Sequence, residues 1–187
     1  QKMTYMKEKF ETSELLVLLS DDATQRQAFT WIMQTHQQKI YWHIRKMVIV
    51  HDDANDILQN TFLKAWSSIK KFRGECQIST WLYKIATNET IDFLNSQKSK
   101  NNAIDLQDAL VLSMESPSYF NGNEAQAKLQ KAILELPQKQ RLVFNMRYFD
   151  EIPYEEMSKI LNTSVGALKA SYHHAVKKIE KYILQCN

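Results

Sequence analysis

The sequence predicts an all-α protein of two small helical domains joined by a flexible linker, with a helix-turn-helix in the second domain. Only three Gly and three Pro occur in 187 residues, too few for the tight turns of an all-β fold. Apolar residues recur at three- and four-residue spacing along most of the chain, which is the period of amphipathic helices. We expect an N-terminal arm over 1–23, a first domain over 24–95, a linker over 96–123 and a second domain over 124–187.

Composition excludes several classes of protein but does not identify one. The net charge of +3 is too small to indicate nucleic-acid binding unless the basic residues cluster. Cys76 and Cys186 lie far apart and form no Cys-x-x-Cys motif, which favours free thiols in a reducing cytoplasm and argues against a zinc site. No apolar run is long enough for stable membrane insertion, and residues 1–20 lack the plan of a signal peptide.

The first domain begins with apolar residues at helical spacing that become sparse around 35–38. We therefore expect two helices or one bent helix here, built on Ala28, Phe29, Ile32, Ile40, Ile44, Met47 and Val48. The preceding arm is polar except for a short apolar patch over 15–19.

A clearer helix follows over 52–69. Asp52 and Asp53 suit its N-terminus, where the helix dipole favours negative charge. Its apolar stripe comprises Ile57, Leu58, Thr61, Phe62, Ala65, Trp66 and Ile69. The other face is acidic and amide-rich, but no His or Glu completes a metal or acid/base set, so we expect neither metal binding nor catalysis.

Basic residues and a glycine over 70–74 end this helix, and a loop over 75–79 leads to a helix over 80–94. Glu89 interrupts its apolar stripe, so either it reaches a partner across the core or the helix rotates there. Another face combines hydrogen-bonding, cationic and aromatic groups: Thr80, Lys84, Thr87 and Asn88, flanked by Trp81 and Tyr83. Such a face suits single-stranded nucleic acid, and an ordinary solvated face is the alternative.

Residues 95–123 are rich in Ser, Asn, Gln and Lys, which is typical of a linker. Apolar spacing then predicts one helix up to Leu136 and, after Pro137, a second that carries Leu142, Val143, Met146 and Phe149.

The stretch 152–184 predicts a helix, a tight turn and a longer helix. Pro153 suits the first helical position, Asn162 tolerates a left-handed turn, and Ser164 can cap the second helix. The outward side of that helix is small at its start and basic at its end, as in helices that read DNA: Ala167, Ala170, Ser171, His174, Lys177, Lys178 and Lys181. A helical hairpin with a solvated lysine face is the alternative.

Two groups of segments resemble one family. DANDILQNTFLKAW (53–66), KFRG (71–74) and TWLYKIATN (80–88) resemble region two of the extracytoplasmic-function (ECF) sigma factors of bacterial RNA polymerase, a group of the sigma-70 family. LPQKQRLVF (136–144), YEEMSKIL (154–161) and SVGALK (164–169) resemble region four, in the same order. The sequence departs from the family pattern at Asn60, where an acid is common, and at Ala170-Ser171, where Ser-Arg is common.

The resemblance implies a cytoplasmic, non-enzymatic sigma factor with no cofactor and no small-molecule substrate. Such a protein binds core RNA polymerase, directs it to promoters and assists DNA melting. The resemblance also implies an anti-sigma factor as a partner. It implies polymerase contacts at Asp53, Asp56, Gln59 and Asn60. The melted minus-ten strand would meet Arg73, Glu75, Cys76, Gln77, Ile78, Ser79, Trp81, Lys84 and Asn88, with 75–79 as the pocket for a flipped base. The minus-thirty-five duplex would meet Ser164, Val165, Gly166, Ala167, Lys169, Ala170, Ser171, His173, His174 and Lys177.

Other classes of protein explain less of the sequence. A stand-alone helix-turn-helix regulator explains the C-terminal segment but gives no role to residues 53–94. A helical adaptor that acts only through protein contacts gives no function to the solvent-exposed lysine face. An enzyme is disfavoured, because the sequence has no phosphate-binding glycine loop and no nucleophile with a base. A metal at His173-His174 is also disfavoured, because adjacent helical residues diverge by about 100°.

Overall fold

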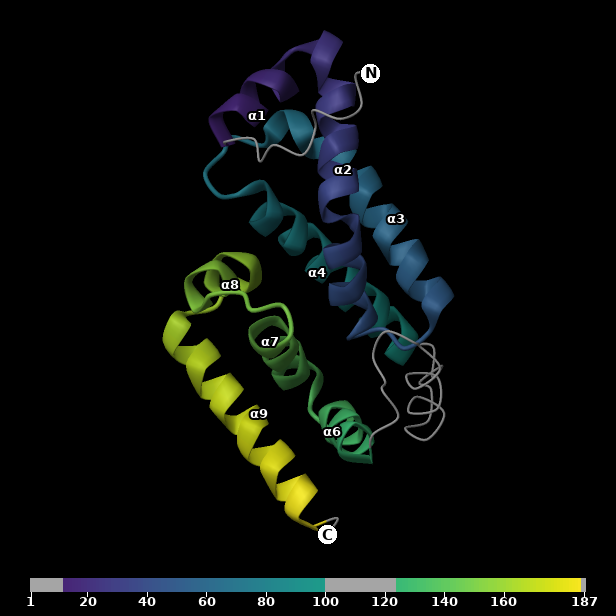
Figure 1. The fold of residues 1–187 in the computed structure, drawn as a ribbon, viewed down its shortest axis with the longest axis vertical. Coiled ribbons are helices and arrows are strands. Elements are labelled where there is room, and N and C mark those ends of the chain that lie inside the picture. The colour runs from purple at the N-terminus through teal and green to yellow at the C-terminus, as the bar shows by residue number, and fades with distance from the viewer. Residues whose placement is uncertain (1–11, 100–123, 186–187) are drawn as a thin grey trace.

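The computed structural model describes residues 12–99 and 124–185, and every secondary-structure element in these ranges is helical, which confirms the predicted all-α class (Figure 1). The elements are α1 (Thr12–Ser20), α2 (Asp22–Arg45), α3 (His51–Ser68), the 3-10 helix η1 (Ile69–Lys71), α4 (Ile78–Ser99), α6 (Glu124–Leu134), α7 (Gln138–Tyr148), α8 (Tyr154–Leu161) and α9 (Val165–Gln185). The predicted linker lies almost entirely outside the described residues.

Helix α1 packs on α2 although the sequence indicated only a polar arm with a short apolar patch. Leu15 and Leu19 from that patch are buried in the core. The corner between the two helices is fixed by side chains of α2: Thr24 Oγ1 donates to the carbonyl of Leu18 at 2.7 Å, and Gln25 Nε2 donates to that of Leu19 at 2.8 Å. The patch is thus one face of a short helix.

Helices α2 and α3 form most of the N-terminal core. α2 is a single helix, because the polar stretch over 35–38 contains no Gly or Pro to break it. α3 carries Asp52 and Asp53 in its first turn, as predicted. Its predicted stripe is largely buried, except that Trp66 stays 39% exposed with its ring centre 5.0 Å from that of Phe29.

Helix α4 begins at Ile78, two residues before the predicted start, after a turn in which Gly74 has a φ of 72°. Glu89 forms an ion pair with Lys64 of α3. Glu89 therefore does reach a partner on the neighbouring helix, but the pair lies at the surface and not across the core, since the Lys64 side chain is 60% exposed.

The C-terminal helices form the predicted helix-turn-helix from α8 and α9. Asn162 ends α8 in the left-handed region with a φ of 49°, and the amide of Ala167 donates to Ser164 Oγ at 3.3 Å, so both the predicted turn and the predicted cap are confirmed. Pro153 occupies the position before the first helical residue of α8 instead of the first position itself.

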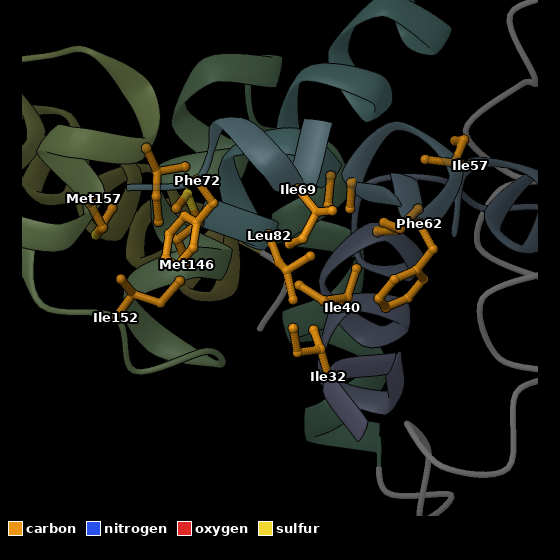
Figure 2. Packing of buried hydrophobic residues seen from close by; sticks show 14 of the residues in the cluster. Ile32, Ile40, Ile57, Phe62, Ile69, Phe72, Leu82, Met146, Ile152 and Met157 are labelled. Atoms are coloured by element: carbon orange, nitrogen blue, oxygen red, sulfur yellow. The ribbon is translucent and has the colours of Figure 1, made fainter. Parts of the chain in front are cut away.

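The N-terminal and C-terminal helices share one hydrophobic cluster (Figure 2). It contains Phe72 and Leu82 from the first group together with Met146, Ile152 and Met157 from the second. Helix α4 lies beside α8 (Figure 1). A smaller cluster binds α6 and α7 to α9. Over the described ranges, no helix is long and apolar enough to cross a membrane.

Candidate nucleic-acid interface

The polar face of α3 lies opposite its buried stripe. Asp56, Gln59 and Asn60 are exposed and lie within two turns of one another, while Asp53 is half-buried one turn earlier. Partial burial raises the pKa of Asp53, and the neighbouring carboxylates of Asp56 and Asp52 raise it further. An apolar residue continues this face: Leu63 is 59% exposed. The face thus offers acids, amides and one leucine to a partner.

The loop before α4 carries polar side chains, and Trp81 in the first turns of α4 packs against the core beside them. Arg73, Glu75 and Gln77 are exposed, whereas Cys76, Ile78 and Ser79 are half-buried. The ring of Trp81 packs against buried Phe72 with centres 5.3 Å apart. Lys84 and Asn88 follow Trp81 at helical spacing and are exposed. These residues form a continuous strip with a stacking surface and a cation, which is the chemistry that single strands require.

Two threonines predicted to share this strip are buried instead. Thr87 is 1% exposed and its hydroxyl lies 2.9 Å from Nε2 of His43. Thr80 is 7% exposed and donates to Glu156 Oε2 of α8 at 2.6 Å. The sequence grouped them with Lys84 and Asn88 because helical spacing alone cannot tell which side of a face another helix covers.

Cys76 shows no sign of being a nucleophile. It is a free, half-buried cysteine. Burial raises the pKa of its thiol, and the nearby carboxylate of Glu156 raises it further, against smaller opposing effects of Lys159 and Lys84. Reactive cysteines have lowered pKa values, so this thiol is suited to packing rather than to chemistry. Cys186 lies outside the described residues.

The outward face of α9 is open from its first turn. Gly166, Ala167, Lys169 and Ala170 are exposed, as are Ser164, His173, His174 and Lys177, whereas Val165 and Ser171 are half-buried. A Cβ added at Gly166 would meet nothing within 4 Å. The small residues therefore leave room for another molecule to approach the start of the helix.

A cationic cluster that the sequence did not indicate lies next to this face. The ring of Tyr154, at the start of α8, has Arg147 Cζ 5.4 Å and Lys169 Nζ 5.8 Å from its centre. The resemblance places Lys169 at the minus-thirty-five duplex but gives no role to Arg147, which lies in the last turn of α7, outside the helix-turn-helix motif. The ring of Tyr154 thus brings two cations to the start of α8.

Comparison with known families matches both halves of the chain. Residues 32–100 match the family described as Sigma-70 region 2, and residues 126–179 match Sigma-70, region 4. The ECF RNA polymerase sigma factor SigW of Bacillus subtilis is 31% identical over 166 residues, which cover 83% of this chain and 89% of that protein. The chain belongs to the ECF sigma factors of the sigma-70 family. Sigma factors are generally non-enzymatic proteins that direct RNA polymerase to promoters, and this is the function of the chain.

Other sigma factors extend the similarity over nearly the whole length. SigV of Bacillus subtilis is 30% identical over 172 residues, 92% of this chain and 93% of that protein. Two solved structures share the fold. RpoE of Bartonella quintana, in complex with the anti-sigma factor NepR, has a TM-score of 0.66 at 21% identity, and the match covers 83% of this chain and 96% of RpoE. CnrH, in complex with the cytosolic domain of CnrY, has a TM-score of 0.68 at 17% identity, and the match covers 92% of this chain and 96% of CnrH. In this sigma factor, α2 to α4 thus make up region two, and α6 to α9 make up region four.

Proposed function

We propose that this sigma factor divides its work among the three surfaces described above. The face of α3 formed by Asp53, Asp56, Gln59 and Asn60 binds core polymerase. The strip from Arg73 to Asn88 binds the melted minus-ten strand, with the loop over 75–79 receiving a flipped base. The start of α9 reads the minus-thirty-five duplex. The main support is that most residues of each surface are exposed and that each surface lies in the segment that matches the corresponding region of the family.

The division within region four follows from side-chain chemistry. Lys169 and Arg147 at the Tyr154 ring bind phosphates and so position the helix, while Ala170, Ser171 and His174 meet base edges. Position 171 carries no arginine for a bidentate guanine contact, so readout depends on small-residue fit, thymine methyl groups and groove shape.

We infer that the protein has no chemistry of its own and acts in the cytoplasm, where it is held inactive by an anti-sigma factor. The support for this partner is that two solved structures with a similar fold are complexes, one with the anti-sigma factor NepR and one with the cytosolic domain of CnrY.

A run-off transcription assay tests the function. Core polymerase with this chain should produce defined transcripts from genomic fragments, and core polymerase alone should not. Binding of the chain to duplex without polymerase, with no transcripts in its presence, would favour a stand-alone regulator instead.

The minus-ten strip has a separate test. Because capturing an extruded base must offset a few kcal/mol of lost stacking, Lys84→Ala should impair open-complex formation more than initial duplex binding. Permanganate footprinting beside gel shifts measures the two stages, and equal losses at both would argue against this strip.

A further inference from the structure

The first half of α9 carries little permanent charge. From Val165 to His174 the sequence has no acid, and Lys169 is its one lysine or arginine. The other basic side chains in this segment are those of His173 and His174. Histidine is the side chain that ordinarily changes charge between pH 5 and pH 8. Protonation of both rings would therefore raise the charge of the segment from +1, which Lys169 supplies, to +3.

Both imidazoles lie on the open side of α9. His173 and His174 are exposed, and their ring centres are 6.1 Å apart with the rings tilted by 57°. Over residues 12–99 and 124–185, neither ring forms a hydrogen bond or an ion pair with another side chain. Both rings are therefore accessible to a molecule that approaches α9 from outside.

Helix α6 packs on the other side of α9. It joins α9 through the smaller apolar cluster, which contains Ala175 and Ile179. Because successive helical residues turn by about 100°, these two positions lie opposite the side that carries His173 and His174. The contact with α6 thus supports α9 from behind and leaves the two rings uncovered.

Helices α7 and α8 bring cations and tyrosines to the start of α9. Arg147 of α7 and Lys169 lie 5.4 and 5.8 Å from the ring centre of Tyr154 in α8. Tyr154, Arg147 and Tyr148 also lie close enough to act electrostatically on Tyr172, which directly precedes His173. The charged groups placed here by the two helices are therefore positive.

The acids of α8 do not pair with the histidines. Glu156 accepts from Thr80 at 2.6 Å and forms an ion pair with Lys159 at 2.9 Å. Glu155 is exposed and, in the part of the chain that the structure describes, forms no ion pair. No carboxylate therefore stabilises a proton on either imidazole in the free protein. Phosphates of bound DNA would do so, because a nearby negative charge favours the charged form of histidine.

The other histidines, His36, His43 and His51, lie in region two. His43 belongs to a buried ionic cluster that joins regions two and four. Its Nδ1 lies 2.8 Å from Oδ2 of Asp150, whose Oδ1 accepts from Nζ of Lys46. Burial would raise the pKa of Asp150, but His43 and Lys46 lower it overall, so its carboxylate stays charged near neutral pH. His43 is 1% exposed and cannot meet DNA.

Helical spacing gives the two exposed histidines different positions on α9. His173 lies one turn after Lys169 and one turn before Lys177, so these three side chains form one line. His174 lies one turn after Ala170, which the proposed function places at base edges. One imidazole thus extends the phosphate-binding line and the other extends the base-reading line.

We propose that binding of the minus-thirty-five duplex is linked to proton uptake from solvent by His173 and His174. The inference rests on the proposed role of α9 in reading this element. Protonated His173 binds a phosphate between Lys169 and Lys177 and strengthens binding to every sequence alike. Protonated His174 has two N–H donors and no acceptor, so it favours the N7 and O6 acceptors of guanine. Affinity and sequence preference therefore both change with pH.

Fluorescence anisotropy of holoenzyme on a labelled promoter duplex, at pH 6, 7 and 8 and fixed ionic strength, tests the linkage. The duplex comes from a promoter that the chain transcribes in the run-off assay. A histidine whose pKa rises from about 6.5 to about 7.5 on binding strengthens affinity about six-fold between pH 8 and pH 6. The parent should gain at least this factor. Its salt slope should also steepen by about 0.9 at pH 6, because His173 adds one phosphate contact.

Four variants assign the effect to residues. His173→Gln should keep one salt slope at both pH values, and His174→Gln should keep one ranking of promoter variants at both. His173→Arg carries a permanent charge, so it should show the steeper salt slope even at pH 8. The matched control is His51→Gln, which replaces an exposed histidine whose Nδ1 lies 2.6 Å from the hydroxyl of Tyr41 in region two. It should behave like the parent, and circular dichroism establishes that each variant is folded.

Two results would overturn the proposal. One is a parent whose affinity is the same at pH 6 and pH 8. The other is a pH dependence that survives in the folded His173→Gln/His174→Gln variant, since another group would then take up the proton. A chain that transcribes from promoters without this pH dependence refutes only the proton linkage. Failure of run-off transcription at every pH refutes the proposed function and the linkage together.

Discussion

Removing the two cations beside Tyr154 should flatten the salt dependence of promoter binding. Arg147 and Lys169 lie 5.4 and 5.8 Å from the ring centre, so two charges are available to phosphates where α8 begins. Each phosphate contact contributes about 0.9 to the slope of log affinity against log salt, so raising the salt four-fold lowers affinity about 3.5-fold per contact. Arg147→Ala/Lys169→Ala should therefore lower the slope by about 1.8 and abolish about a 12-fold salt effect.

Fluorescence anisotropy of holoenzyme on a labelled promoter duplex, at several salt concentrations, measures this slope. The control is Lys131→Ala, which removes the same charge from an exposed position on α6, outside the helix-turn-helix. The control should keep the parent slope, and both single variants should weaken all promoters alike. An unchanged slope in the double variant, or equal flattening by Lys131→Ala, refutes the assignment of Arg147 and Lys169 as the positioning contacts.

Three further outcomes are expected. Asp56→Lys should weaken binding to core polymerase in a pull-down titration without lowering the melting temperature, and unchanged affinity would remove Asp56 from the interface. Ser164→Ala should lower the free energy of unfolding by about 1 kcal/mol in urea, because the start of α9 loses its cap, and an unshifted midpoint would contradict that role. Asp150 has a lowered pKa, so its stabilising pairing with His43 and Lys46 is present above pH about 4 and is lost as the pH falls below that value. Small-angle X-ray scattering between pH 6 and pH 3 should detect separation of regions two and four only at the acid end, and separation at neutral pH would disprove this linkage.

Local sequence patterns predicted most of the helices, because the start and the end of a helix depend mainly on residues within a few positions. The turn at Asn162 and the cap at Ser164 followed from backbone preference and hydrogen-bonding capacity within a few positions. The continuity of α2 could not be predicted, because the polar residues over 35–38 are compatible with either a helix or a loop. They continue the helix because no Gly or Pro breaks it and apolar residues on both sides pack into the core.

Features that depend on distant partners could not be predicted. His43 carries no local signal of burial in the sequence, yet it is 1% exposed and meets Asp150, 107 positions later in the chain. Arg147 lies outside the helix-turn-helix motif and meets Lys169 only through the ring of Tyr154. Both depend on how separate helices come together in space, information that the period of apolar residues does not contain. The assignments of individual residues to polymerase and DNA stay predictions.

The shared ionic cluster limits how freely the two halves of this protein can be exchanged. A hybrid that joins residues 1–99 to region four of a relative without an acid at the position of Asp150 would bury Lys46 without its carboxylate partner. Burying one unpaired charge costs several kcal/mol, so the hybrid halves would not close on each other even if each folded and kept its own ligand. Regions two and four therefore bind different partners, but an exchange of region four must keep an acid at the position of Asp150 to preserve the contact between them.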